Sequence, residues 1–246
     1  MEYSVKDIKF LKSNLIAHRG LYNNNKGVIE NTMLAFKKAM ECEYIIELDV
    51  HAIKDSTVVV FHDDNIKRLT GIDKKLRNCT YKEIKDIKLD KTNETIPTLN
   101  EVLKYINGKV PVIIELKYDT RLGILEKQVM NILKEYKGEY AIQSFNPLSI
   151  AWVRYKQPQV IRGQIASEFV NEKMSFLKRM FLKNMLFNFI SNPDYISYSI
   201  ENANEEKILK LKKKYLMLGW TIKNKEEFNK YKDIYDNLIC ENILEC

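Results

Sequence analysis

Short runs of β-branched and aromatic residues recur along the chain, and polar stretches long enough to hold a helix separate most of them. The spacing predicts nine strands, which are "NLIAH", "YIIELDV", "TVVVFHD", "VPVIIELK", "EYAIQSF", "VIRGQIA", "YISYSI", "YLMLGWTI" and "NLIC". Strands that alternate with helices are typical of βα units in a parallel sheet. Two S/T-x-x-E capping boxes followed by apolar residues support this alternation, at Thr80 with Glu83 and at Thr98 with Glu101.

Nine strands are one more than a closed (β/α)8 barrel holds. The eight residues "HAIKDSTV" between "ELDV" and "VVFHD" are too few for a parallel crossover, so we expect a hairpin there. A two-residue turn at Asp55 and Ser56 would place Asp49 opposite His62. The predicted fold is therefore α/β, a single (β/α)8 TIM barrel over residues 1–246 with a β-hairpin arm after the second strand.

Acidic side chains gather at the carboxyl ends of two predicted strands. Alternation along a strand places Glu47 beside Asp49, and Glu115 beside Lys117 on a later strand. In a barrel this end is the active-site face, and converging carboxylates need a counter-charge there. The all-oxygen set favours one divalent cation, Mg²⁺ or Ca²⁺ with Mn²⁺ as a third candidate, whereas the alternative is salt bridges to Lys117 and Arg19.

Two of the three histidines stand near the same predicted rim. His18 ends the first strand beside Arg19, and His62 ends the hairpin arm. Two histidines near a metal can share the work of general base and general acid, so we expect both to be catalytic. His51 lies further out along the arm, and we interpret it as a structural or rim residue.

The chain resembles the glycerophosphodiester phosphodiesterases, metal-dependent barrel enzymes related in layout to phosphatidylinositol-specific phospholipase C. The resemblance runs in order through short motifs, which are His18-Arg19-Gly20, Glu30-Asn31-Thr32, Glu47-Leu48-Asp49-Val50, His62-Asp63, Ile96-Pro97-Thr98-Leu99, Glu115-Leu116-Lys117, Gln143-Ser144-Phe145 and Trp220-Thr221. Together they span nearly the whole chain.

The resemblance implies a role for each site residue. It implies Glu47, Asp49 and Glu115 as metal ligands, and His18 and His62 as the acid–base pair. It also implies Arg19 and Lys117 as phosphate clamps, with Trp220 flanking a glycerol moiety. We add Gln143 as a polar wall contact.

The chain departs from the family pattern in three places. Ile29 stands where the family usually has proline. The role of Glu30 therefore stays open: it lies either near the site or at the start of a helix, where the helix dipole stabilises an acid. Ser56 replaces the glycine of a K-D-G turn. Near the C-terminus Glu241 stands where the family shows an acid in an I-T-D ending, and we assign it no role.

The charge, the cysteines and the lack of targeting segments indicate which partners, thiol state and location to expect. The formal charge of +7 comes from lysines spread along the chain, which points weakly to anionic small substrates or a membrane surface and argues against nucleic acid. The cysteines lack metal-binding spacing, so we expect free thiols at Cys42, Cys79, Cys240 and Cys246. With neither a signal peptide nor a bilayer-spanning run in view, we expect a cytoplasmic protein.

The sequence leaves three candidate functions open. The first is hydrolysis of a small glycerophosphodiester to an alcohol and sn-glycerol 3-phosphate. The second is a lyase on the same scaffold that releases a cyclic phosphate from lysophospholipid-type substrates. The third is a non-catalytic barrel that binds phosphodiesters at a membrane surface through residues 171–190, with Phe176, Leu177 and Phe181 as apolar contacts. We favour an outer barrel helix for 171–190, between the fifth and sixth parallel strands.

Overall fold

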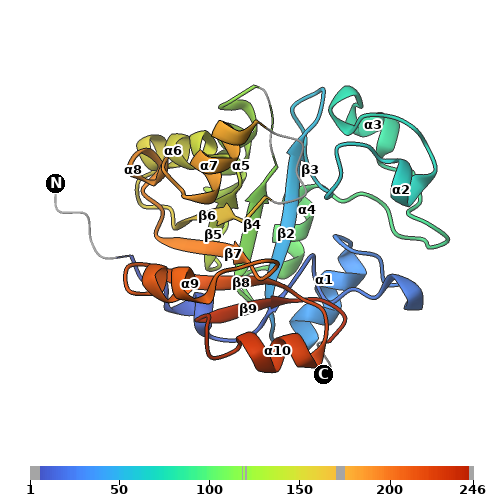
Figure 1. The fold of residues 1–246 in the computed structure, drawn as a ribbon. Helices are drawn as coiled ribbons and strands as arrows, with labels where there is room; N and C mark the ends of the chain where they lie inside the picture. The colour runs from blue at the N-terminus through green and yellow to red at the C-terminus, as the bar shows by residue number, and fades with distance from the viewer. Residues whose placement is uncertain (1–5, 118, 120, 170–174, 244–246) are drawn as a thin grey trace.

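Eight parallel strands close into a barrel in this computed structural model, which describes residues 6–117, 119, 121–169 and 175–243 (Figure 1). Closure follows because β1 pairs with β2 on one side and with β9 on the other. The strands are β1 (Ile16–Ala17), β2 (Ile45–Ala52), β4 (Val112–Leu116), β5 (Tyr140–Ser144), β6 (Arg162–Ala166), β7 (Tyr195–Ser199), β8 (Leu216–Ile222) and β9 (Asn237–Cys240). The predicted (β/α)8 barrel is confirmed.

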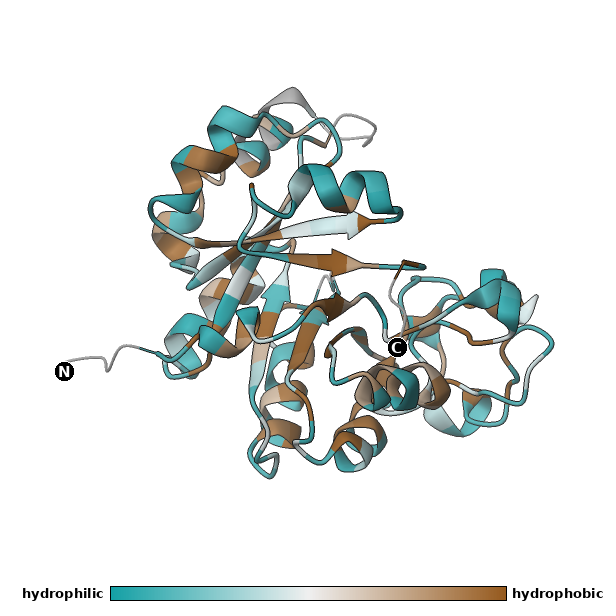
Figure 2. Ribbon diagram, turned by 90° about the horizontal axis from the view of Figure 1, so that it is seen from below, coloured by the Kyte–Doolittle hydropathy of each residue, from teal (hydrophilic) through white to brown (hydrophobic). Residues whose placement is uncertain are grey.

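Helices join the strands and cover the outside of the barrel (Figure 1). They are α1 (Met33–Glu41), α4 (Leu99–Ile106), α5 (Ile124–Leu133), α6 (Pro147–Lys156), α7 (Phe176–Lys183), α8 (Asn188–Ser191), α9 (Glu205–Lys212) and α10 (Lys225–Tyr231), with short 3-10 turns η1 (Lys9–Lys12) and η2 (Asn24–Lys26). In Figure 2 these helices carry both hydrophilic and hydrophobic residues.

The described part of the segment 171–190 contains α7 and the start of α8, which ends at Ser191, so it holds two helices rather than one. α7 and α8 lie between β6 and β7, the fifth and sixth parallel strands, as predicted. Arg154 on α6 fixes α8 through hydrogen bonds to the carbonyls of Phe189 (3.0 Å) and Ile190 (2.7 Å). Residues 171–174 and the side chains of Phe176, Leu177 and Phe181, named above as membrane contacts, lie outside the described part of the structure.

The predicted arm is present, but its predicted register is wrong. β3 (Val58–Val60) pairs antiparallel with β2, with Val50 opposite Val60. Asp49 therefore lies opposite Phe61, whose N–H donates to the Asp49 carbonyl at 3.0 Å, and not opposite His62. The cause is a three-residue loop at 54–56, in which Ser56 adopts a left-handed φ of 64°. The extra loop residue shifts the pairing by one position.

A small layer of helices follows the arm; the sequence predicted the helix start at Thr80 but not the layer as a whole. Residues 61–98, here called the insertion segment, contain α2 (Lys67–Thr70), η3 (Leu76–Asn78) and α3 (Tyr81–Ile84). They lie beside the β2–β3 hairpin (Figure 1). A separate apolar cluster, which includes Val59, Phe61, Ile66, Leu76, Ile84 and Ile96, holds this layer together.

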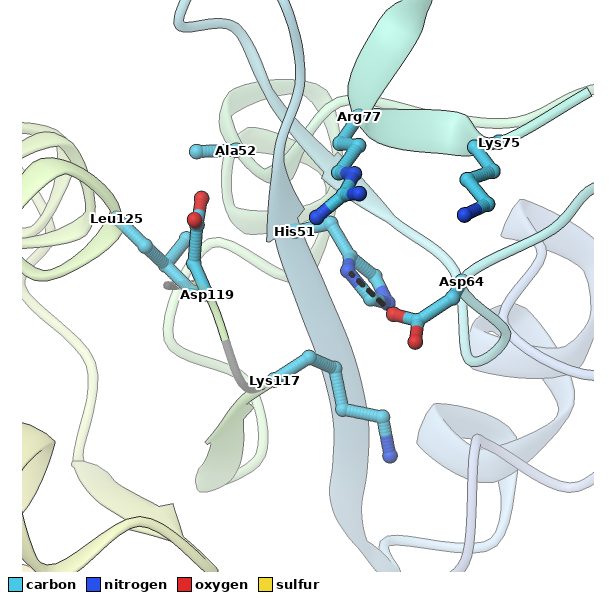
Figure 3. Close-up of a pocket in the computed structure, with 8 residues that line it drawn as sticks. All are labelled: His51, Ala52, Asp64, Lys75, Arg77, Lys117, Asp119 and Leu125. Carbon is cyan, nitrogen blue, oxygen red and sulfur yellow. Dashed lines mark ion pairs between the residues drawn. The ribbon is translucent and has the colours of Figure 1, made fainter. Parts of the chain in front are cut away.

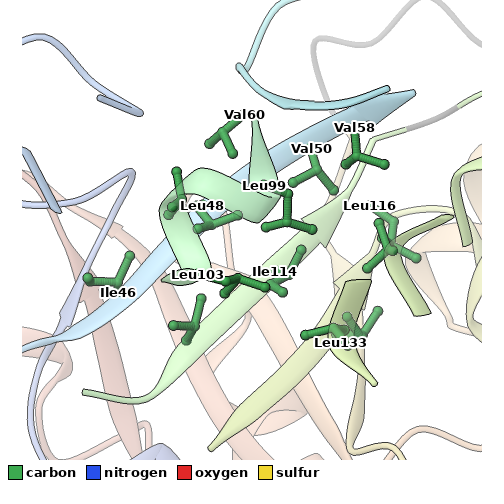
Figure 4. Packing of buried hydrophobic residues seen from close by; sticks show 14 of the residues in the cluster. Ile46, Leu48, Val50, Val58, Val60, Leu99, Leu103, Ile114, Leu116 and Leu133 are labelled. Atoms are coloured by element: carbon green, nitrogen blue, oxygen red, sulfur yellow. The ribbon is translucent and has the colours of Figure 1, made fainter. Parts of the chain in front are cut away.

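The apolar core has two parts, one on each face of the barrel sheet. Outside the barrel, Ile46 and Leu48 of β2 and Ile114 of β4 pack in one cluster with Leu99 and Leu103 of α4 (Figure 4). Inside, one residue from each of several strands forms a dry plug, made of Ile16, Ile45, Ile113, Ala141, Tyr195, Leu218 and Ile239. Because side chains alternate along a strand, the residues two positions later project inward above this plug, toward the carboxyl end.

The cysteines only partly match the prediction. Cys79 and Cys240 are buried free thiols, as expected. Cys42 is disulfide-bonded, so the prediction of a free thiol is wrong there, and Cys246 lies outside the described residues. Sequence spacing does not show which cysteines approach within bonding distance.

None of the helices in the described ranges combines the length and the apolar character needed to cross a bilayer.

The capping box before α4 yields a stability prediction. The Glu101 N–H donates to Thr98 Oγ1 (3.2 Å), and the Thr98 N–H donates to Glu101 Oε2 (2.8 Å). We expect Thr98→Ala to lower the free energy of unfolding by about 1 kcal/mol, measured by urea denaturation. Thr98→Ser keeps the hydroxyl and serves as the control. Equal losses in the two variants would contradict the capping role.

Candidate active site

Three buried carboxylates converge at the carboxyl end of neighbouring strands β2 and β4. Glu47, Asp49 and Glu115 each offer one oxygen, and these oxygens lie within 4.8 Å of one another. The three residues are 1%, 1% and 8% exposed. The strand register places Asp49 directly beside Glu115. The predicted convergence of these acids is confirmed.

Two cationic side chains face the three acids. Lys117 Nζ lies 2.8 Å from Glu115 Oε1 and 3.0 Å from Asp49 Oδ1, and Arg19 Nε lies 3.4 Å from Asp49 Oδ2. The salt-bridge alternative is therefore partly realised. Three acids against two cations still leave a negative excess within this group, and oxygen ligands of this kind suit a hard divalent ion.

The acids respond unequally to burial. Burial, together with the neighbouring charges of Asp49 and Glu115, raises the pKa of Glu47 well above its ordinary value. Burial also disfavours the charged form of Asp49, but Lys117 and Arg19 outweigh it and hold the pKa of that carboxyl far below its usual range. The mutual repulsion of the three carboxylates thus falls mainly on Glu47, and a bound cation would relieve it.

The loop after β1 holds Arg19 over the acids. Gly20 has a φ of 80°, and a Cβ on it would lie 2.9 Å from the backbone carbon of Ala35 on α1. The close approach lets the Leu21 N–H donate to the Ala35 carbonyl at 3.0 Å. Only glycine fits this contact and this backbone angle without strain. The Arg19 N–H in turn donates to Glu47 Oε2 at 3.2 Å.

A carboxylate from the far end of the chain orients His18. Its Nδ1 lies 3.0 Å from Glu241 Oε2, which also accepts a hydrogen bond of 2.5 Å from the Tyr22 hydroxyl. Burial lowers the pKa of His18, although Glu241 opposes the shift. Burial would raise the pKa of Glu241, but His18 and Tyr22 outweigh it and bring it to about 2. The only signal for Glu241 in the sequence was its position in the C-terminal motif.

The insertion segment orients His62. Its Nδ1 lies 2.6 Å from Asp63 Oδ1, and Arg68 Nε on α2 donates to the other Asp63 oxygen at 2.6 Å. Arg68 also pairs with Glu30 (2.7 Å), which pairs with Arg19 (2.7 Å). Glu30 therefore lies beside the site. Sequence reasoning left this open, and it missed Arg68 because no local pattern marks it.

Of the predicted site residues, all except Asp49 line one cavity of about 110 Å³. It is lined by His18, Arg19, Glu47, Glu115 and Lys117, and by His62, Gln143, Phe145 and Trp220. Gln143 Nε2 also donates to Glu47 Oε1 at 3.3 Å, so it steadies an acid as well as lining the wall. Trp220 meets Phe145 edge to face, with ring centroids 5.6 Å apart.

His51 faces a different cavity. Its Nε2 lies 3.2 Å from the His62 carbonyl oxygen, and its Nδ1 lies 4.0 Å from Asp64. It lines a neighbouring space of about 270 Å³ (Figure 3).

Comparison with known proteins agrees with this geometry. Residues 18–239 match the Glycerophosphoryl diester phosphodiesterase family. A protein of Caldanaerobacter subterraneus named glycerophosphodiester phosphodiesterase is 34% identical over 237 residues, covering 89% of this chain and 90% of that protein.

Solved structures share the fold. A glycerophosphodiester phosphodiesterase from Thermotoga maritima is 26% identical with a TM-score of 0.70, covering 92% of this chain and 94% of that one. A phosphodiesterase from Oleispira antarctica, solved in complex with the product sn-glycerol-3-phosphate, has a TM-score of 0.80 at 21% identity and covers 94% and 93%. Since the sequence match extends over most of the chain, this protein belongs to the glycerophosphoryl diester phosphodiesterase family.

Proposed function

We propose that residues 1–246 act as one barrel domain that hydrolyses small glycerophosphodiesters to an alcohol and sn-glycerol 3-phosphate. The observation that carries this proposal is that both His18 and His62 line the cavity into which the carboxylates converge. The names of the Caldanaerobacter and Thermotoga relatives support the substrate class. The product bound in the Oleispira phosphodiesterase supports sn-glycerol 3-phosphate as the product here.

Glu47, Asp49 and Glu115 would hold one divalent cation, Mg²⁺ or Ca²⁺ with Mn²⁺ as a third candidate. When bound, such an ion supplies positive charge where the phosphate oxygens gain negative charge. Arg19 and Lys117 both lie against Asp49. They would add two further positive charges beside the phosphate oxygens of the substrate. Burial lowers the pKa of Lys117, but Asp49 and Glu115 outweigh it and hold that pKa above its ordinary value, so the ammonium stays charged.

The two histidines carry the proton transfers. In each ring Nδ1 is tied to a carboxylate, Glu241 for His18 and Asp63 for His62, which leaves Nε2 to exchange a proton with the substrate. One imidazole removes the proton of the nucleophile, which is water or the glycerol 2-hydroxyl, and the other protonates the leaving alkoxide. Attack by water gives the hydrolysis products directly. Attack by the 2-hydroxyl expels the alcohol and gives a cyclic phosphate, which water then opens at the P–O2 bond to sn-glycerol 3-phosphate.

The apolar wall of the cavity suits the glycerol carbons. Trp220 and Phe145, which meet edge to face, form this wall, and Lys117, Arg19 and the polar Gln143 line the same cavity. An aromatic face packs on the C–H groups of a polyol, and the cations hold the phosphate. Together these contacts fix both ends of the substrate.

Cation binding is testable without activity. We expect Mg²⁺ or Ca²⁺ to raise the melting temperature of the wild type, because a ligand that binds only the folded state stabilises it by about 3 kcal/mol at a hundredfold excess over Kd. Glu115→Gln should lose most of this shift. Glu139→Gln, an exposed acid before β5, should keep it. A shift that is equal in all three proteins would contradict the metal site.

Removal of either imidazole tests the chemistry. We expect His18→Ala and His62→Ala each to lower kcat for glycerophosphocholine hydrolysis by about 10²-fold or more, measured by release of sn-glycerol 3-phosphate. Phosphorus NMR of the wild-type reaction separates the candidate functions. Accumulated cyclic phosphate would favour the lyase, and no turnover with any of the three ions would favour a non-catalytic binding barrel.

Glu241 tests how His18 is held. We expect Glu241→Gln to lower kcat by about tenfold or more, since the ring loses the carboxylate that fixes its Nδ1 proton. Tyr22→Phe removes one hydrogen bond to that carboxylate and leaves it charged, so its effect should be smaller. Equal kcat in Glu241→Gln and the wild type would show that His18 needs no such support.

A further inference from the structure

A second cavity of about 270 Å³ adjoins the catalytic one and has no part in the mechanism above (Figure 3). Its walls come from β2, from the insertion segment and from the end of β4. The residues that matter here are His51, Asp64, Lys75, Arg77, Lys117 and Asp119.

The two cavities meet at Lys117, which lines both of them. The carbonyl of His62 lies 3.2 Å from His51 Nε2, so the backbone of one catalytic residue is tied to the floor of the second space. The two cavities are therefore neighbours on either side of the Lys117 side chain.

The lining of the second cavity holds an excess of positive charge. Lys75 and Arg77 are exposed, and within the described residues their charged ends make no ion pair or hydrogen bond, although the charge of Arg77 acts on the Asp119 carboxylate. Asp119 is already paired, because Arg121 Nη2 donates to its Oδ2 at 2.8 Å. Asp64 is the remaining acid of the lining, and its side chain is 91% exposed.

The wall that bears these cations is preformed. Leu76 stands between Lys75 and Arg77, is fully buried, and donates its N–H to the Asp64 carbonyl at 2.8 Å. The Lys54 N–H of the hairpin loop donates to the Cys79 carbonyl at 2.9 Å. Hydrogen bonds thus hold the backbone at both ends of η3. The side chains of Lys75 and Arg77, on either side of Leu76, extend into the cavity (Figure 3).

We propose that this second cavity binds the leaving alcohol of the substrate and favours alcohols that carry their own anionic group, a phosphate or a carboxylate. The inference rests on the proposed function. A phosphodiester has two ester arms on one phosphorus; the wall of Phe145 and Trp220 takes the glycerol arm, and the other arm passes Lys117 toward Lys75 and Arg77. Cationic side chains recognise phosphate and carboxylate through charge-assisted hydrogen bonds.

The experiment compares kcat/KM for three substrates that share the glycerophospho group. They are glycerophosphoglycerol with a neutral alcohol, the same compound with a terminal phosphate on that alcohol, and glycerophosphocholine. We expect the wild type to prefer the phosphorylated alcohol over the neutral one by about fivefold to tenfold at low salt, the scale of two partly exposed ion pairs. The preference should shrink at high ionic strength.

Paired variants assign the preference to this wall. Lys75→Gln with Arg77→Gln should bring the ratio of kcat/KM for the anionic and neutral substrates close to one, and Lys75→Glu with Arg77→Glu should reverse it. Lys82→Gln with Lys104→Gln removes two exposed charges outside the cavity and should keep the wild-type ratio. Activity on the neutral substrate shows that each variant is folded.

The outcomes separate the two proposals. A wild type that hydrolyses all three substrates without preferring the anionic alcohol overturns the subsite, as does a preference that survives in the Lys75 and Arg77 variants. A wild type that hydrolyses none of the three overturns the proposed function itself.

Discussion

The mutual repulsion of three buried carboxylates is the constraint on which the site depends. Glu47, Asp49 and Glu115 are held together by the register of β2 and β4, above an apolar plug that gives them no solvent. Ionised acids at this distance raise one another's pKa unless positive charge is close by. Arg19 and Lys117 supply part of that charge, and a divalent cation would complete it. The same positive charge is what a phosphodiester needs for binding and for the stabilisation of its transition state.

The barrel brings the three acids together, and other parts of the chain orient the two histidines that we propose as the acid–base pair. His18 at the end of β1 is oriented by Glu241 after β9, so its position depends on the closure of the barrel between the first and last strands. His62 is oriented by Asp63, which Arg68 of the insertion segment holds in place. The insertion segment thus positions one imidazole and also forms the cationic wall of the second cavity. A single addition to the barrel serves both the chemistry and the proposed choice of leaving group.

Local periodicity accounts for what was predictable. Each apolar run and each capping box is a property of neighbouring residues, so the strands, the helix starts before α3 and α4, and the alternation of helix and strand could be predicted. The strict period of two in a strand also placed Glu47 with Asp49 and Glu115 with Lys117 on the inner face. Family resemblance added the order of the motifs, which no periodicity contains.

The sequence by itself determined the barrel, its inward-facing acids and the two histidines at its rim, because these follow from patterns only a few residues long. Only the tertiary structure decided the hairpin register, through the left-handed conformation of Ser56, and the layer built by the insertion segment. It also decided that Glu241 meets His18 and that Arg68 meets Glu30, contacts between residues 223 and 38 positions apart. Such pairs form only when the closed sheet and the insertion segment pack together. A local sequence pattern does not show which distant residues come into contact.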